Sequence, residues 1–242
     1  MKIRFLGTRG YIKPRSSSHK MHSCMMVSYY TTRLLVDCGE DWLGRVEELS
    51  PDAIVLTHAH PDHAWGLKRC APCPVHATAE TWEEIKDFDV AENNRRKISP
   101  GRKKTIGRLS VKAFTVEHST RCPAVGYRIE AGDSKIFYAP DLVYIHDREK
   151  ALKGIDLYIG DGATLKSPMV RKRGNRLIGH VPVRTQLTWC AKENVPRAAI
   201  THCGSGIVKA DPRKLANDLR KMADERGVEA FIAKDGMELV LR

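Results

Sequence analysis

Short apolar runs alternate with longer amphipathic stretches along the 242-residue chain. Runs rich in β-branched and aromatic residues, bounded by glycine or polar residues, predict strands, and stretches with helical periodicity predict helices. The expected strands are 3–7, 24–29, 33–37, 53–57, 75–77, 109–116, 126–131, 134–139, 156–160, 198–201, 229–233 and 238–241. The expected helices are 42–49, 63–69, 81–88, 147–153, 183–193 and 212–225. Strands in adjacent runs with helices between them favour an α/β fold of packed sheets with helices outside.

Length and composition indicate a globular protein with one core. We expect residues 1–242 to form a single domain, and the apolar fraction of 42% excludes wholesale disorder. No run approaches the roughly 20 apolar residues of a membrane span, and the charged start at 1–7 is unlike an export signal. Seven scattered cysteines then predict reduced thiols in a cytoplasmic protein.

The charge balance favours a polyanionic partner. Lys and Arg number 41 against 29 Asp and Glu, a formal charge of +12. Nucleic acid or a nucleotide fits this excess, although charge kept for solubility alone is the alternative. The basic residues gather in 93–108 and 166–176, which contain no acidic residue, and in the Ser-rich stretch 13–22. That last stretch holds Arg15, His19, Lys20 and His22 and either rims a cleft or is simply exposed.

A His-rich segment follows directly on the apolar run 53–56. His58 and His60 stand two residues apart, and Asp62 and His63 follow Pro61. In an extended chain, residues two apart point to the same side, so His58 and His60 can reach one ion. The turn into a helix at Pro61 directs Asp62 and His63 toward a second ion. Imidazole and carboxylate ligands suit zinc, with manganese or iron as alternatives, whereas a surface His cluster without metal is disfavoured by the flanking strand and helix.

The spacing His-x-His-x-Asp-His resembles the signature of the metallo-β-lactamase fold superfamily of hydrolases. Other features follow in the order of that superfamily: the strand 34–39 with Asp37, which orients the metal loop, and then His118, Asp141 and His202. The resemblance implies an αββα four-layer sandwich with a cleft for two divalent metal ions at one edge. The implied ligands are His58, His60 and His118 for one ion, Asp62, His63 and His202 for the other, and Asp141 as a bridge.

Two departures narrow the reaction that the resemblance implies. Asp141 stands where many true β-lactamases of the superfamily have a cysteine, and His60 stands where the flavodiiron oxidoreductases have a glutamate. Antibiotic hydrolysis and di-iron redox chemistry are therefore disfavoured. Hydrolysis of a phosphodiester, a thioester or a lactone-like ester remains, by water activated between two ions.

His180 favours the phosphodiester. The segment 177–183 precedes a helix and is similar to the ribonuclease Z-like and cyclic-phosphate phosphodiesterases, in which an equivalent histidine faces the scissile phosphate. An alkoxide leaving group needs a proton or a positive contact, and imidazole supplies both near neutral pH. We therefore expect Asp62, which is also a ligand, and His180 to be the catalytic side chains. A histidine that only bonds locally at the helix start is the alternative.

The preferred interpretation is a dinuclear metal-dependent phosphodiesterase or nuclease that acts on nucleic acid or a nucleotide-like substrate. A thioester or lactone hydrolase of the glyoxalase II type, and a nucleic-acid-binding module with a non-catalytic metal, stay open. Analogy alone suggests a homodimer. The long arm of ribonuclease Z has no expected counterpart before His180. Whether Cys70 and Cys73, with His76, bind an extra metal is left open by a two-thiol motif without a second pair.

Overall fold

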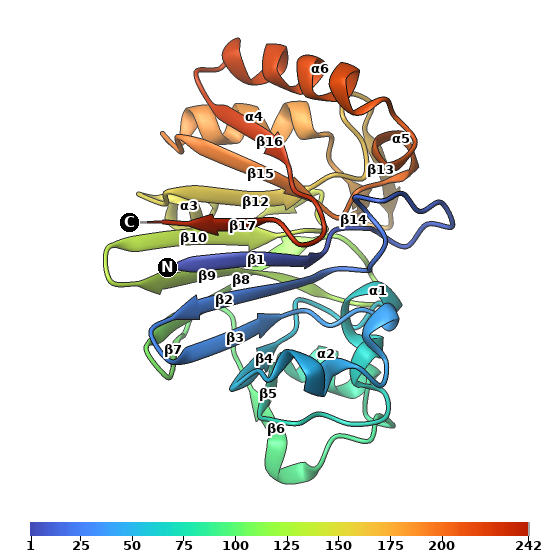
Figure 1. Cartoon of the computed structure of the whole chain (residues 1–242), viewed down its shortest axis with the longest axis vertical. Helices are drawn as coiled ribbons and strands as arrows, with labels where there is room; N and C mark the ends of the chain where they lie inside the picture. Colours follow the sequence, from blue (N-terminus) through green and yellow to red (C-terminus); the bar gives the residue numbers. More distant parts are fainter. Residues whose placement is uncertain (242) are drawn as a thin grey trace.

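Two sheets packed face to face form the centre of the molecule (Figure 1). The structure is a computed structural model that describes residues 1–241. The first sheet runs in the order β17-β1-β2-β3-β4-β5-β6. Its strands are β1 (Lys2–Gly7), β2 (Cys24–Tyr29), β3 (Thr32–Val36), β4 (Ala53–Val55), β5 (Val75–Ala77), β6 (Arg95–Lys97) and β17 (Glu238–Val240).

The second sheet runs in the order β11-β8-β9-β10-β12-β15-β16, and β7 pairs with β8 beside this path. Its strands are β7 (Lys103–Ile106), β8 (Leu109–Glu117), β9 (Ala124–Ala131), β10 (Ser134–Ala139), β11 (Tyr144–Ile145), β12 (Leu157–Asp161), β15 (Arg197–Thr201) and β16 (Glu229–Ile232). A separate two-stranded hairpin consists of β13 (Met169–Arg173) and β14 (Arg176–His180).

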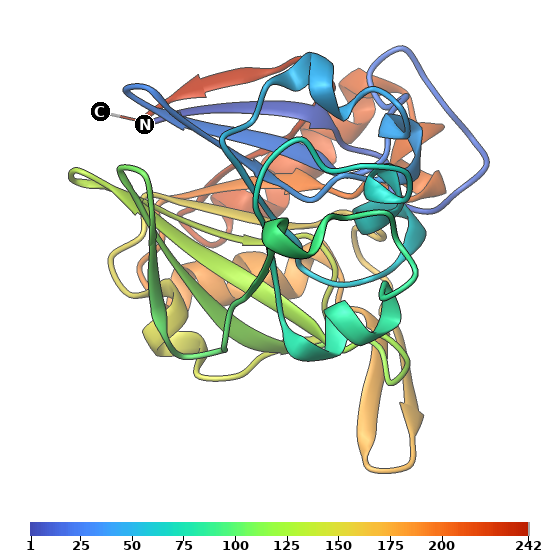
Figure 2. The ribbon, with the colours of Figure 1, turned by 90° about the horizontal axis from the view of Figure 1, so that it is seen from below.

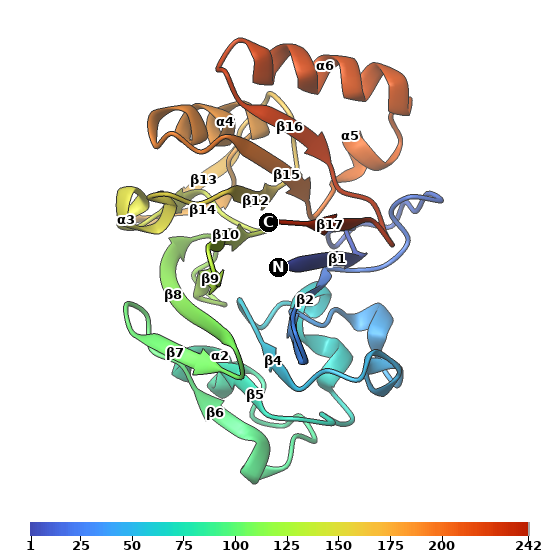
Figure 3. The same cartoon turned by 60° about the vertical axis from the view of Figure 1, so that its left-hand side comes forward.

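Helices cover the outer faces of both sheets. They are α1 (Pro61–Ala64), α2 (Ala79–Glu84), α3 (Arg148–Leu152), α4 (Val183–Lys192), α5 (Ser205–Val208) and α6 (Pro212–Asp224). Figures 1 and 3 show α4 and α6 outside the second sheet, and a buried cluster packs α1 and α2 against the outer face of the first (Figure 1). The predicted αββα sandwich is therefore confirmed.

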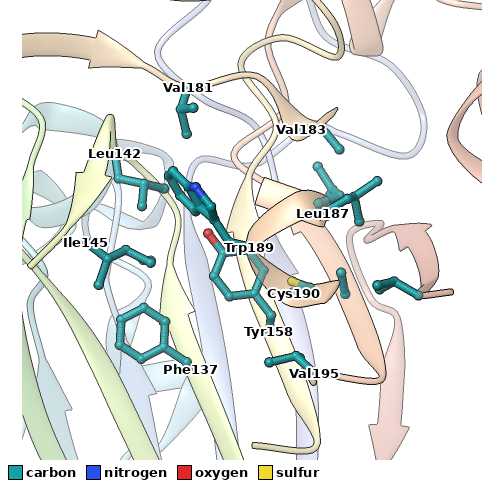
Figure 4. Packing of buried hydrophobic residues seen from close by; sticks show 14 of the residues in the cluster. Phe137, Leu142, Ile145, Tyr158, Val181, Val183, Leu187, Trp189, Cys190 and Val195 are labelled. Carbon is teal, nitrogen blue, oxygen red and sulfur yellow. The ribbon is translucent and has the colours of Figure 1, made fainter. Parts of the chain in front are cut away.

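Apolar packing holds these layers together. Between the sheets, Phe5 and Val36 of the first meet Tyr127 and Ile159 of the second in one buried cluster. A second cluster joins the outer face of the second sheet to α4, where Figure 4 shows Phe137, Tyr158 and Leu187 side by side. Because both faces of the second sheet are buried, its central strands are nearly continuous apolar runs, which is why they were predictable from sequence.

Three expectations about local structure were wrong. The predicted helix 42–49 is a pair of short 3-10 turns, Glu40–Trp42 and Val46–Leu49. The stretch 93–108, in which no strand or helix was predicted, contains β6 and β7. The basic stretch 166–176 lies mostly in the β13–β14 hairpin, which projects from the body of the molecule in Figure 2. Both hairpin strands are largely exposed, so they lack the alternation of buried and exposed positions that reveals a strand.

No helix among residues 1–241 is both long and apolar enough to cross a bilayer.

Candidate metal centre

Strand ends bring the predicted site residues to one edge of the sandwich. His58 and His60 follow β4, and His60 is the extended residue from which α1 begins at Pro61. His118 follows β8, and Asp141 follows β10. His202 comes directly after β15 in the left-handed region, with a φ of 50°. Residues far apart in sequence therefore meet because their strands end together.

The first group consists of His58, His60, His118 and Asp141, whose ligand-type atoms all lie within 4.8 Å of one another. His58 Nε2 lies 2.9 Å from His60 Nδ1, and His118 Nε2 lies 3.1 Å from the same nitrogen. Nitrogens that bind one tetrahedral zinc at ~2.0–2.1 Å stand roughly 3.3 Å apart, so these three are close to that spacing. All three predicted ligands of the first ion therefore converge.

The second group consists of Asp62, His63 and His202. Asp62 Oδ2 lies 3.0 Å from His202 Nε2 and 3.4 Å from His63 Nε2. Asp141 stands between the groups: its Oδ2 is 3.5 Å from His58 Nε2 and 3.6 Å from both His63 Nε2 and His202 Nε2. This is the position that a bridging carboxylate requires.

A second layer of polar groups fixes the imidazole rings. Asp37, fully buried in a left-handed conformation, places Oδ2 2.8 Å from His63 Nδ1 and accepts a hydrogen bond from the backbone of Thr57. Thr57 Oγ1 lies 3.0 Å from His58 Nδ1. The carbonyl oxygen of Gly179 accepts from His118 Nδ1 at 3.2 Å. Engaging Nδ1 leaves Nε2 of these three rings to face the group, the usual arrangement around a metal-binding histidine, whereas His60 faces the group with Nδ1.

Burial sets the charge of the first group. It lowers the pKa of His58, helped by His63, and lowers the pKa of His60 to about 4, helped by His118. These imidazoles are neutral at pH 7, so each ring has a nitrogen lone pair that it can offer to a cation.

Carboxylates surround the imidazole rings of the second group. Burial opposes protonation of His63, but the carboxylates of Asp62 and Asp37 raise its pKa to about 10. His63 Nε2 and Asp141 Oδ1 are buried and form no well-aligned hydrogen bond, although His180 Nδ1 and His118 Nδ1 lie 2.9 and 3.0 Å from that oxygen. Divalent cations bound to both groups would satisfy these atoms and neutralise the carboxylates, so the residues present fit two metal ions. The ligand roles themselves stay predictions.

His180 lies beside this cluster, held by a carboxylate that sequence reasoning missed. His180 Nδ1 hydrogen-bonds Asp161 Oδ2 at 2.9 Å and lies 2.9 Å from Asp141 Oδ1. Asp161 is fully buried, and the backbone amides of Leu142 and Ala163 donate to its two oxygens. The available signal was its place at the end of the apolar run 157–160, directly before glycine.

A pocket of about 610 Å³ opens over these residues, and we call it the metal pocket. Its lining includes His60, Asp62, His118, Asp141, His180 and His202, together with Tyr11 of the N-terminal loop and Met169 of the hairpin. Five of the seven predicted ligands therefore border a space that a substrate can enter, unlike the closed shell of a structural zinc site.

A family model described as a beta-lactamase superfamily domain matches residues 32–203, a range that contains every predicted ligand. The chain belongs to this superfamily. This metallo-β-lactamase-fold protein is 34% identical over 145 residues to ribonuclease Z of Methanopyrus kandleri, a match that covers 53% of this chain and 50% of that one. The chain thus spans about half the length of this curated relative.

Solved structures agree with the fold. The metallo-β-lactamase fold protein YhfI from Bacillus subtilis superposes with a TM-score of 0.75 at 20% identity, covering 98% of each chain. A diphosphatase of the PhnP family superposes with a TM-score of 0.74 at 18% identity, covering 100% of this chain and 98% of the other. At such identities the likeness shows the fold alone.

No cysteine belongs to the potential ion-binding groups of His, Cys, Asp and Glu within the described chain. Cys70 is partly exposed, Cys73 is buried, and both are free thiols. The structure of this metallo-β-lactamase-fold protein therefore gives no support to an extra metal site at Cys70 and Cys73.

Proposed function

We propose that this protein is a dinuclear metal-dependent phosphodiesterase that hydrolyses nucleic acid or nucleotide-like phosphodiesters. The observation that carries the proposal is the placement of His180 between two carboxylates at the rim of the metal pocket. Burial opposes protonation of this ring, but Asp161 and Asp141 raise its pKa to about 11. The buried carboxylate of Asp161, which is not a predicted metal ligand, therefore favours the imidazolium form of this ring.

An imidazolium can donate a proton to a leaving group that is too basic to depart unprotonated. The alkoxide released from a phosphodiester needs a proton, whereas the thiolate released from a thioester has a conjugate acid of pKa near 8.5 and leaves without one. With Nδ1 held by Asp161, His180 Nε2 can donate a proton to the leaving oxygen. Asp161 is a positioning residue, because it keeps the ring oriented and protonated.

The predicted ligands provide the other half of the chemistry. His58, His60 and His118 would hold one ion, Asp62, His63 and His202 the other, and Asp141 both. Bound zinc, manganese or iron would lower the pKa of a water molecule and stabilise charge on phosphoryl oxygens. Burial raises the pKa of Asp62, but His63 and His202 hold it well below the usual range, so this carboxylate stays ionised and can accept a hydrogen bond from the attacking water.

The surroundings of the pocket support a polyanionic substrate. The β13–β14 hairpin borders the metal pocket through Met169 and His180 and carries Arg171, Lys172 and Arg173 on exposed strand positions. A relative is named ribonuclease Z and a structural neighbour a diphosphatase, and both names describe chemistry at phosphorus. A cytoplasmic location and a homodimer stay predictions from sequence.

A panel assay tests the proposal. Metal content is measured on purified protein, and hydrolysis is then followed for bis(p-nitrophenyl) phosphate, single-stranded RNA, single- and double-stranded DNA, a lactoylglutathione-like thioester and a cephalosporin. We expect about two ions per chain and turnover of at least one phosphodiester, both lost in His58→Ala. Turnover confined to the thioester would establish the glyoxalase II-type alternative. Polyanion binding that survives His58→Ala, with no hydrolysis of any compound, would establish the non-catalytic module.

A further inference from the structure

A second pocket lies next to the metal pocket, and we call it the loop pocket. It measures about 390 Å³ and is lined by Arg9, Tyr11, Ile12, Lys13, Arg15 and His22. Tyr11 and Ile12 also line the metal pocket, so the two spaces share a wall. Nothing in the proposed hydrolysis uses this second space.

The loop that forms this wall is fixed against the metal centre. A Cβ atom on Gly10 would lie 3.0 Å from the ring of His202, and the amide of Gly10 donates to Cys203 O at 3.2 Å. Arg9 is 2% exposed and donates to the carbonyl oxygens of Ile12 and Lys20. The loop is therefore anchored at its base, and its outer side chains have a defined place relative to the metal centre.

The loop pocket carries surplus positive charge. Arg9 and Arg15 both donate to Asp41, at 2.6 and 2.8 Å, and Lys13 adds a third cation. Two of these three cations share one carboxylate, so positive charge is in excess around the loop pocket. Burial and then Arg9 lower the pKa of His22 to about 4, so His22 adds no charge at neutral pH.

Tyr11 stands between the two pockets with its ring open to solvent. The side chain is 63% exposed, which is unfavourable because an exposed apolar ring gains no free energy from burial. Its ring centroid lies 5.8 Å from that of His22. An exposed aromatic ring beside a basic groove is the usual platform on which a nucleobase stacks. Tyr11 thus stands between two anion sites, the metal pocket and the loop pocket. In a polynucleotide, two phosphates likewise flank each nucleoside and its base.

We propose that the loop pocket binds the phosphate next to the scissile one on a polynucleotide, with Tyr11 stacking on the base between them. The inference rests on the proposed function and names its substrate as at least a dinucleotide rather than a small diester. Lys13 and Arg15 contact the neighbouring phosphate, while Arg9 keeps the loop in place.

Equilibrium binding tests the proposal without turnover. Thymidine 3′,5′-bisphosphate, thymidine 5′-monophosphate and thymidine 3′-monophosphate are titrated calorimetrically into the zinc-loaded full chain. The bisphosphate carries two phosphates across one nucleoside, so we expect it to bind about tenfold more tightly than either monophosphate. Lys13→Gln combined with Arg15→Gln should reduce this ratio to within about threefold. Tyr11→Ala should weaken all three ligands by about tenfold, and Tyr11→Phe should retain their affinity.

Lys20→Gln is the matched control, because Lys20 is an exposed cation on the same loop outside the lining of the loop pocket. This variant should leave the ratio between the affinity for the bisphosphate and the affinities for the monophosphates unchanged. A wild-type ratio below about threefold, or a loss in Lys20→Gln equal to that of the double variant, overturns the subsite. Failure of the proposed function looks different: bis(p-nitrophenyl) phosphate and the nucleic acids stay intact while the binding ratio persists.

Discussion

His180 is the residue on which the choice of substrate class depends most. We expect His180→Ala to lower kcat for an oligonucleotide by roughly 10²–10⁴-fold, the usual contribution of a general acid. Metal content should be retained, because Asp141 keeps its place between the two groups. The loss should be smaller for bis(p-nitrophenyl) phosphate, since nitrophenolate leaves without a proton. Parallel kinetics on both substrates, with metal analysis of each variant, check this.

His146→Ala is the control for that comparison. His146 pairs with Glu117 at 2.9 Å, its side chain is 47% exposed, and it does not line the metal pocket. Its removal should leave both rates unchanged. If His180→Ala lost metal and activity together, His180 would be a ligand or a structural residue rather than an acid.

At the scale of single residues, the sequence identified candidate site residues where residue type and spacing together indicate metal binding, and it missed a residue whose type is common throughout the chain. His58, His60, Asp62 and His63 form a local pattern whose spacing alone brings donors together. Asp161 is one acid among 29 Asp and Glu residues, and its role depends on a hydrogen bond to a side chain 19 positions away. A contact of that kind has no sequence signature.

The strand β5 carries a buried histidine that makes stability depend on pH. Burial, followed by Lys104 and Arg96, lowers the pKa of His76 to about 4. In the unfolded chain the pKa is near 6.5, so unfolding takes up a proton between about pH 6.5 and 4. The stability that depends on neutral His76 is therefore fully present above about pH 6.5 and is lost as the pH falls toward 4. His76→Leu should reduce the loss of unfolding free energy between about pH 7.5 and 5 by about 1–2 kcal/mol, measured by urea denaturation.

His146→Leu serves as the comparison, since this histidine is half exposed. Between the same two pH values, His146→Leu should lose more unfolding free energy than His76→Leu. Equal slopes in the wild type and His76→Leu would show that burial does not hold His76 neutral.

The cations of the β13–β14 hairpin should strengthen the binding of long polyanionic substrates and not of short ones. Changing Arg171, Lys172 and Arg173 to Gln should raise the ratio of KM for a single-stranded oligonucleotide to KM for bis(p-nitrophenyl) phosphate by about tenfold. If each cation contacts a phosphate, the slope of log Kd against log salt should fall by about 2. Fluorescence anisotropy across a salt series measures the slope.

A triple change on α6, Arg213→Gln, Arg220→Gln and Lys221→Gln, removes the same charge from exposed positions that do not line the metal pocket. It should change the slope far less than the hairpin variant. Equal effects would mean that net charge, and not the hairpin, attracts the polyanion.

Elements were predictable where burial imposes a pattern. The buried strands β10 and β12 and the amphipathic helix α6 lie within a few residues of their predicted bounds. The hairpin was missed because its sequence is dominated by cations on exposed positions, and pairing such as Val170 with Gly179 leaves no hydrophobic trace. Its turn at Gly174, with a φ of 59°, was the available signal.

At the scale of the whole molecule, bound metal should contribute to stability. An ion that binds the folded chain and not the unfolded one raises the unfolding free energy, by about 4 kcal/mol at a thousand times its Kd. For a chain of this length, chelation should therefore lower Tm by roughly 10 °C, and added zinc should restore it. Differential scanning calorimetry should show one transition, because we propose that residues 1–242 form one domain around the core shared by both sheets.

Two variants sharpen that measurement. Asp141→Asn should lose most of the response to chelator, whereas Asp147→Asn, at an exposed helix start, should keep it. A Tm unaffected by chelation in the wild type would contradict metal binding at both groups.

The predicted ligands come from both sides of the sandwich, since 58–63 belongs to the first sheet and His118, Asp141 and His202 to the second. Each half alone therefore offers an incomplete set of donors. Two separately produced fragments, cut between β6 and β7, would capture a divalent ion tightly once they had reassembled. Affinity for the ion then becomes a readout of docking between halves, and a chelating dye would follow the last step of assembly in real time.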